Sequence, residues 1–74
     1  MKLTMEQLEQ EINDGCWDDL ISYEGQEPKN IARVGRYILH TDSQGFRDME
    51  IADSEEEAEA FMDRVRAEDF GEEN

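Results

Sequence analysis

The side chains of this sequence that could do chemistry are mostly carboxylates, and the densest group follows Ser54. Its members are Glu55, Glu56, Glu59 and Asp63. Residues three and four apart are neighbours on an α-helix, so this spacing lines the acids along one helix. Carboxylates can pair with arginine and lysine, bind metal ions or transfer protons. Metal binding and proton transfer need them to converge in a pocket. Acids spread along a helix therefore favour salt bridges with a partner.

His40 and Cys16 are the only histidine and cysteine. A lone histidine without a marked partner is weak support for a nucleophilic pair, and we expect Cys16 to be a small buried residue. The loop at 42–45 lacks the oxygen ligands of an EF-hand, and no glycine phosphate loop, zinc spacing or nucleophile elbow is found. We expect no enzyme, no cofactor and no metal site.

The acids belong to a helix that we predict from Ser54 to about Glu68. Ser54 and Glu57 have the spacing of a capping box, in which each side chain binds the other residue's backbone N–H. The apolar residues then recur at helical intervals on a single face. They are Ala58, Phe61, Met62 and Val65.

A second capping box, Thr4 with Gln7, predicts a helix near the N-terminus. Its apolar face carries Met5, Leu8 and Ile12. Asp14-Gly15 should end it, because glycine adopts the left-handed conformation that closes many helices.

Between the helices the sequence predicts three strands, at 17–23, 31–41 and 46–51. A loop at 25–30 and a hairpin turn at 42–45 separate them. We interpret Gly35 as lying within the second strand. In the third, Arg47, Met49 and Ile51 share one face. The expected fold is α+β, a single small α-β-β-β-α domain with a three-stranded antiparallel sheet packed against two helices. Residues 1–70 form the domain and 71–74 an acidic tail.

The second predicted strand has no purely apolar face. In continuous alternation, one face carries Arg33, Tyr37, Leu39 and Thr41, and the other carries Val34, Arg36, Ile38 and His40. If the helices cover one face, the other stays open. Arginine stems can cover that face. Alternatively, it is a partner or homodimer contact through Arg36 and Tyr37.

The chain has 74 residues and a formal charge of −14. This charge disfavours binding to nucleic-acid phosphates and favours basic protein partners. No apolar run approaches the roughly 20 residues of a membrane span, and a single cysteine fits a reducing compartment. We expect a cytoplasmic protein. Residues 1–27 carry −7, residues 28–47 carry +3 and residues 48–74 carry −10, so both ends are acidic.

In size, charge, lack of catalytic motifs and element order, the chain resembles small acidic inhibitor proteins encoded by phages, such as anti-CRISPR proteins and other DNA mimics. The resemblance implies an inhibitor of a nuclease or nucleic-acid-binding complex, acting in the host cytoplasm. The expected contacts on the last helix are the acids named above. Outside it, the candidates are Asp18, Asp19 and Glu24. The alternatives are a small dimeric structural or adaptor protein, and a salt-adapted protein whose acidity serves only solubility.

Overall fold

The computed structural model describes residues 2–23 and 28–69. The elements in chain order are α1 (Met5–Asn13), β1 (Asp19–Tyr23), β2 (Lys29–Val34), β3 (Tyr37–Asp42), β4 (Arg47–Ile51) and α2 (Glu55–Asp69). The strands form one antiparallel sheet in the order β1-β2-β3-β4. The α+β class and both helices are confirmed, but the prediction of three strands is wrong. Residues 25–27 of the predicted loop and the tail at 71–74 lie outside the described residues.

Local side chains and a glycine define both ends of α1. At its start, Thr4 N donates to Gln7 Oε1 at 2.9 Å and Gln7 N donates to Thr4 Oγ1 at 3.1 Å. At its end, Gly15 has φ +84°. The amides of Gly15 and Cys16 donate to the carbonyls of Ile12 and Glu11. This is the Schellman arrangement, so the predicted stop is confirmed.

The fourth strand arises because Gly35 is in a turn and not within a strand. Gly35 has φ +61°, and Val34 pairs with Tyr37, which leaves Gly35 and Arg36 as a two-residue hairpin loop. A positive φ at the first loop residue only is the pattern of a type II′ turn, which suits the twist of paired strands. The predicted strand 31–41 is therefore two strands, β2 and β3.

This turn changes which residues share a face of the sheet. Arg33 is paired with Ile38, and Val34 with Tyr37. Arg33 thus lies on the face of Ile38, and its predicted grouping with Tyr37 is wrong. The continuous alternation failed because a two-residue loop brings odd positions of β2 opposite even positions of β3. In β4, Arg47, Met49 and Ile51 share one face as predicted.

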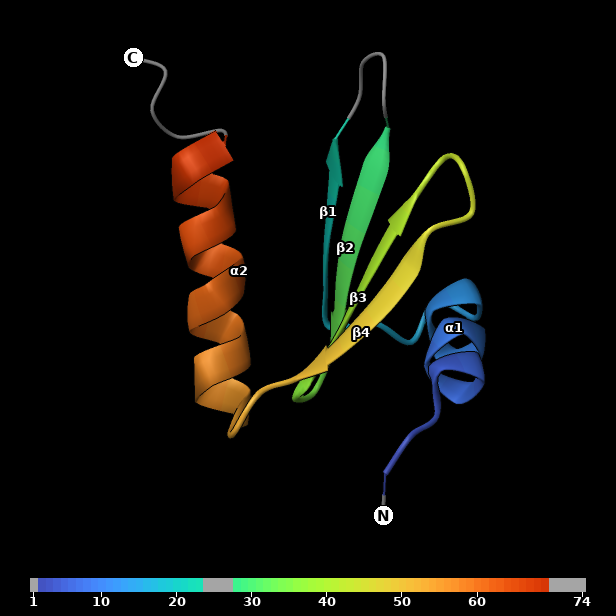
Figure 1. Ribbon diagram of the computed structural model, residues 1–74. Helices are drawn as coiled ribbons and strands as arrows, with labels where there is room; N and C mark the ends of the chain where they lie inside the picture. The colour runs from blue at the N-terminus through green and yellow to red at the C-terminus, as the bar shows by residue number, and fades with distance from the viewer. Residues whose placement is uncertain (1, 24–27, 70–74) are drawn as a thin grey trace.

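Both faces of the sheet are covered, one by each helix (Figure 1). On the α2 face, the buried cluster is Ile21, Ile31, Ile38, Ala58 and Met62. On the other face α1 packs on β2 and β3 and contributes Leu8, which is fully buried. The expectation of one open face is wrong. Because each face has its own helix, apolar residues occur at both alternating sets of positions.

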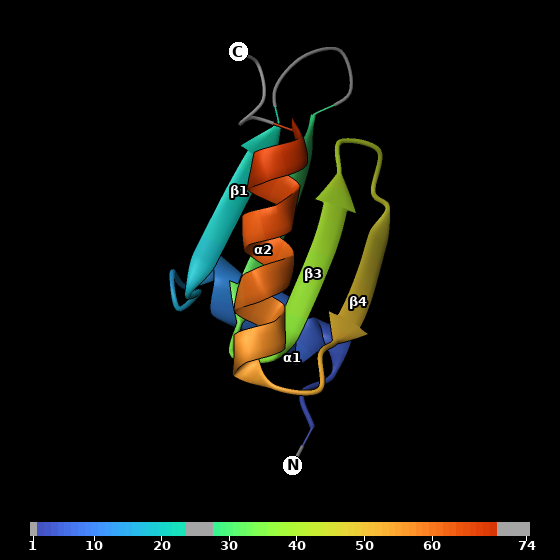
Figure 2. The same ribbon diagram turned by 90° about the vertical axis from the view of Figure 1, so that its left-hand side faces the viewer.

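The apolar stripe of α2 is confirmed. Ala58 and Met62 are fully buried, and Phe61 and Val65 pack against the same cluster. The helix lies over β1 and β2, while much of β3 and β4 stays uncovered on that side (Figure 2). No helix within the described residues is long and apolar enough to cross a membrane.

Candidate functional site

The outer face of α2 carries three of the four predicted acids as an exposed row, and Glu55, which is also exposed, lies in the first turn outside this row. Glu56, Glu59 and Asp63 are all exposed, and the small side chains of Ala60 and Ala67 beside them are exposed too. At about 1.5 Å of rise per residue, Glu56 and Asp63 lie roughly 10 Å apart along the helix axis. We call Glu56, Glu59 and Asp63 the α2 ridge. Alanines leave its carboxylates free to protrude.

Local capping accounts for the first turn of α2. Glu57 N donates to Ser54 Oγ at 3.1 Å. Three acids, Glu55, Glu56 and Glu57, occupy this turn, where the positive end of the helix dipole stabilises negative charge. The predicted start is confirmed, and Glu55 and Glu57 have a sufficient local explanation.

Two of the predicted acids lie beside a buried arginine. The Arg33 side chain is only 9% exposed, and its Nη1 donates to Gly35 O at 2.7 Å. Asp18 Oδ2 lies 3.9 Å from Nη1, and Glu59 Oε2 lies 3.6 Å from Nη2. The fold thus brings together acids 41 positions apart in the sequence. Glu59 belongs both to the α2 ridge and to this cluster.

Asp18 also has a structural role. Its Oδ2 accepts a hydrogen bond from Gly35 N at 2.8 Å. Together with the bond from Arg33 to Gly35 O, this satisfies both backbone groups of the first turn residue. Asp18 therefore holds the β2–β3 turn in place, which leaves it less available to a partner than the α2 ridge.

Asp19 is bound within the protein. Arg66 donates from Nη1 and Nη2 to its two carboxylate oxygens at 2.9 and 2.6 Å. These hydrogen bonds lower the pKa of Asp19 below its usual value and raise the pKa of Arg66. The pair connects α2 to the first residue of β1, so Asp19 stabilises the fold.

On the opposite side of the molecule, α1 carries a smaller acidic surface. Arg47 Nη1 donates to Glu9 Oε1 at 2.7 Å, and this bond raises the pKa of Arg47. Glu6 is exposed and Glu11 is half-buried. Acidic groups therefore lie on both sides of the sheet.

The proposed sheet-face residues lie at the turn and beneath α1. Arg36 is exposed in the hairpin loop, and its carbonyl accepts from Ala52 N at 2.9 Å. Tyr37 is half-buried, and its hydroxyl accepts from Leu3 N at 3.1 Å. Tyr37 thus anchors the segment before α1. Glu24 lies outside the described residues.

Cys16 is exposed, so its predicted burial is wrong. The reason is its position directly after α1, where its backbone closes the helix and its side chain points out of the core. Within residues 2–23 and 28–69, no group of three or more potential ligands could hold a metal ion.

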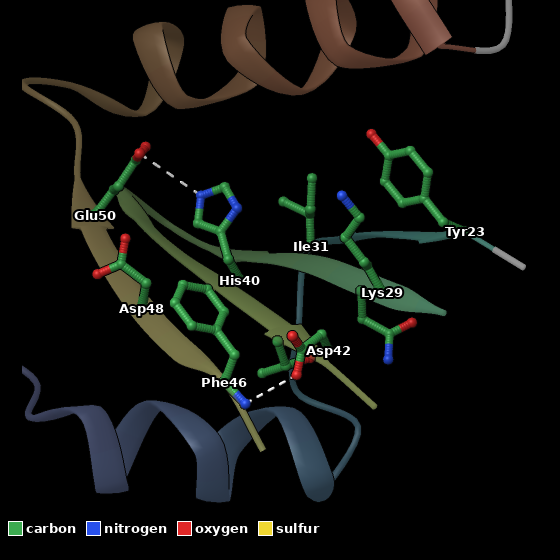
Figure 3. A pocket seen from close by; sticks show the side chains of 10 residues that line it. Tyr23, Lys29, Ile31, His40, Asp42, Phe46, Asp48 and Glu50 are labelled. Atoms are coloured by element: carbon green, nitrogen blue, oxygen red, sulfur yellow. Dashed lines mark hydrogen bonds and ion pairs between the residues drawn. The ribbon is translucent and has the colours of Figure 1, made fainter. Parts of the chain in front are cut away.

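The sequence reasoning missed a pocket of about 450 Å³ on the part of the sheet that α2 leaves uncovered (Figure 3). Its lining includes His40, Asp42, Phe46, Asp48 and Glu50. The sequence feature that could have indicated this pocket is Phe46, an aromatic residue directly after a polar turn. In the structure Phe46 is 55% exposed. His40 Nε2 lies 3.6 Å from Glu50 Oε2, and its ring contacts Phe61 edge-to-face.

Neither protein-family models, curated proteins nor solved structures match this chain. The candidate site therefore rests on the geometry of the chain itself.

Proposed function

We propose that this protein binds a basic surface of a nucleic-acid-binding protein through the α2 ridge and thereby inhibits it. The observation that carries the proposal is the exposure of Glu56, Glu59 and Asp63 along one side of a helix. Among the described residues, no cation lies within ion-pair distance of Glu56 or Asp63. The carboxylate of Asp63 interacts with Arg66 only at longer range, where it helps to raise the pKa of Arg66, so both carboxylates can form ion pairs with cations of a partner.

The spacing of the ridge suits groups that otherwise hold phosphates. Successive ridge acids are three and four residues apart, which is about 4.5 and 6 Å along the axis. Phosphates of one DNA strand advance by about 3.4 Å per nucleotide. The ridge steps lie between one and two nucleotide steps, and the long side chains of arginine and lysine can span the difference. Arginine can also form two parallel hydrogen bonds to each carboxylate.

The overall charge supports encounter with such a target. A charge of −14 on 74 residues attracts a basic surface over distances comparable to the Debye length. This attraction raises the association rate, while the ridge supplies the register of the bound state. Occupation of the basic surface then excludes nucleic acid.

The test compares two triple variants with the same change in charge. The first, Glu56→Gln with Glu59→Gln and Asp63→Asn, neutralises the ridge. The second, Glu6→Gln with Glu11→Gln and Asp14→Asn, removes three charges from α1 and the residue that follows it. Each is used to capture partners from a lysate of the source cell or its host, followed by mass spectrometry and a nucleic-acid-binding assay of the captured protein.

We expect the ridge variant to lose at least tenfold in affinity, and the α1 variant to stay within threefold of the unaltered protein. Inhibition of nucleic-acid binding should fall in parallel. Equal losses in both variants would show that only net charge matters. Full binding by the ridge variant would show that the contact lies elsewhere, and either result overturns the proposal.

A further inference from the structure

The pocket missed by the sequence reasoning lies over β2, β3 and β4, beside α2 (Figure 3). Its volume of about 450 Å³ is within the range of sites that enclose a small ligand or a large side chain. Rings of Tyr23, His40 and Phe46 and the side chain of Ile31 supply apolar surface. The pocket therefore offers an apolar surface on which a ligand can pack.

Acids dominate the charge of this pocket. Three carboxylates line it, those of Asp42, Asp48 and Glu50, against the single ammonium of Lys29. Lys29 Nζ lies 5.6 Å from the centre of the Tyr23 ring, so this cation already has an aromatic partner inside the pocket. The remaining charge is negative, which excludes anions and favours a cation.

Contacts within the β3–β4 turn fix Asp42 and the backbone of Phe46. Asp42 Oδ1 accepts from Gln44 N at 2.9 Å and from Phe46 N at 2.8 Å. Gly45 in this turn has φ +93°. These contacts fix the backbone of Phe46 while its ring stays more than half exposed. A group that binds here meets an exposed aromatic ring on a fixed backbone.

Two of the acids can accept hydrogen bonds from a ligand. Asp48 is exposed and, within the described residues, has no hydrogen bond or ion pair to its side chain. Among the described residues, Glu50 makes an ion-pair contact with His40 at 3.6 Å, and the buried His40 Nε2 makes no hydrogen bond. A strong hydrogen-bond donor on a ligand would therefore stabilise both carboxylates.

We propose that this pocket binds an arginine side chain of a partner protein. The planar guanidinium stacks on the Phe46 ring, and its N–H groups donate to Asp48 and Glu50. Arginine fits better than lysine because its flat, weakly hydrated head packs on an aromatic face while it donates in two directions. An uncharged apolar ligand would leave the carboxylates without compensation.

A neighbouring pocket gives the chain that carries this arginine a place to lie. It has a volume of about 390 Å³, shares Glu50 with the first, and runs along α2 past Phe61 and Arg64. The two pockets therefore meet at Glu50 beside α2. Glu59 of the α2 ridge faces Arg33 on the other flank of the helix. The arginine pocket is therefore a separate surface, and it does not depend on the proposed function.

The test uses a nine-residue glycine-serine peptide with one central arginine, and two matched peptides in which citrulline or lysine replaces it. Citrulline keeps the shape of arginine without its charge. Binding to the full chain is followed by amide chemical shifts at about 0.15 M salt, where long-range attraction is screened beyond about 8 Å. We expect shifts centred on Phe46, Asp48 and Glu50. The citrulline peptide should bind at least tenfold more weakly, and the lysine peptide severalfold more weakly.

Variants then separate the pocket from general acidity. Phe46→Ala, and Asp48→Asn combined with Glu50→Gln, should each weaken the arginine peptide about tenfold. The control, Glu6→Gln with Glu11→Gln, removes two negative charges from α1. Its affinity for the arginine peptide should stay within twofold of that of the unaltered protein. Circular dichroism checks that each variant is folded. The ridge variant should also bind the peptide normally, so this test can succeed where the proposed function fails.

Equal binding of the arginine and citrulline peptides would overturn the proposal, since charge would then play no part. Equal weakening by the pocket and α1 variants would overturn it as well, because attraction would then be non-specific. Shifts confined to the α2 ridge would place the cation at that surface and would exclude the pocket.

Discussion

Arg66 near the end of α2 donates hydrogen bonds to both carboxylate oxygens of Asp19 at the start of β1, at 2.9 and 2.6 Å. The two residues are 47 positions apart. Bidentate pairing of this kind has the geometry in which a surface ion pair contributes most. Asp19, which we predicted from the sequence as a possible partner contact, thus connects the helix α2 to the sheet.

Replacing Asp19 by asparagine should destabilise the protein at neutral pH by about 1 kcal/mol, since the pair is partly solvent-screened. The folded pKa of Asp19 is lowered. Its contribution is therefore complete above the unfolded pKa of about 4 and is lost as pH falls through the lower folded value. Melting temperatures of the two proteins should differ at pH 7 and converge once the pH falls below the lowered folded pKa of Asp19.

The control for this comparison is Glu68→Gln. Glu68 is an exposed acid of α2 with no ion-pair partner among the described residues. It measures what one less negative charge does to the self-repulsion of the chain. If Asp19→Asn and Glu68→Gln shift the melting temperature equally at every pH, the pair with Arg66 contributes nothing.

A second prediction concerns the chirality of residue 35. An added Cβ at Gly35 meets only Glu55 Oε2, at an ordinary 3.8 Å, so space is not the constraint. The constraint is φ +61°, which costs an L-residue roughly 1–2 kcal/mol. In the chemically synthesised chain, L-alanine at this position should lower the free energy of unfolding by that amount.

D-alanine at the same position has the same atoms but favours positive φ. It should keep or slightly raise the stability, because it restricts the unfolded chain without strain in the turn. Denaturant titration of both chains checks the prediction. Equal destabilisation by the two enantiomers would show that the side chain, and not the backbone conformation, disturbs the turn.

The same glycine explains why the helices could be predicted and the sheet only in part. Each helix has a local start signal, Thr4 with Gln7 and Ser54 with Glu57, and these act within a single turn of chain. At Gly35, strand alternation and a hairpin turn are both consistent with the local residues. The choice depends on the pairing of Val34 with Tyr37 and on a helix that covers each face, which are properties of the whole fold.

In the candidate site, too, some features follow from the local sequence and others depend on the whole fold. The exposed positions of Glu56 and Asp63 follow from helical periodicity, and the structure agrees. The contacts of Asp18 and Glu59 with Arg33 depend on how α2 is placed over β2. Sequence spacing therefore identifies an acidic ridge, but tertiary packing decides which acids stay free to meet a partner.

A third prediction contrasts two large apolar residues. Met62 is fully buried, whereas Phe46 is 55% exposed. Met62→Ala should cost about 2–5 kcal/mol, enough to unfold much of a domain this small. Phe46→Ala should change stability by no more than about 0.5 kcal/mol. Thermal unfolding followed by circular dichroism measures both, and a large loss with Phe46→Ala would mean that its ring supports the fold.

The last prediction separates partner binding from salt adaptation. The Debye length falls from about 30 Å at 0.01 M salt to about 10 Å at 0.1 M, so most of the long-range self-repulsion of a −14 charge is screened in this range. The melting temperature should therefore rise up to about 0.2 M potassium chloride and then level off, whereas ridge-dependent binding should weaken steadily over the same range. A salt-adapted protein would instead gain stability into the molar range. A continuing rise, with ridge binding insensitive to salt, would assign the acids to solubility and contradict the proposed function.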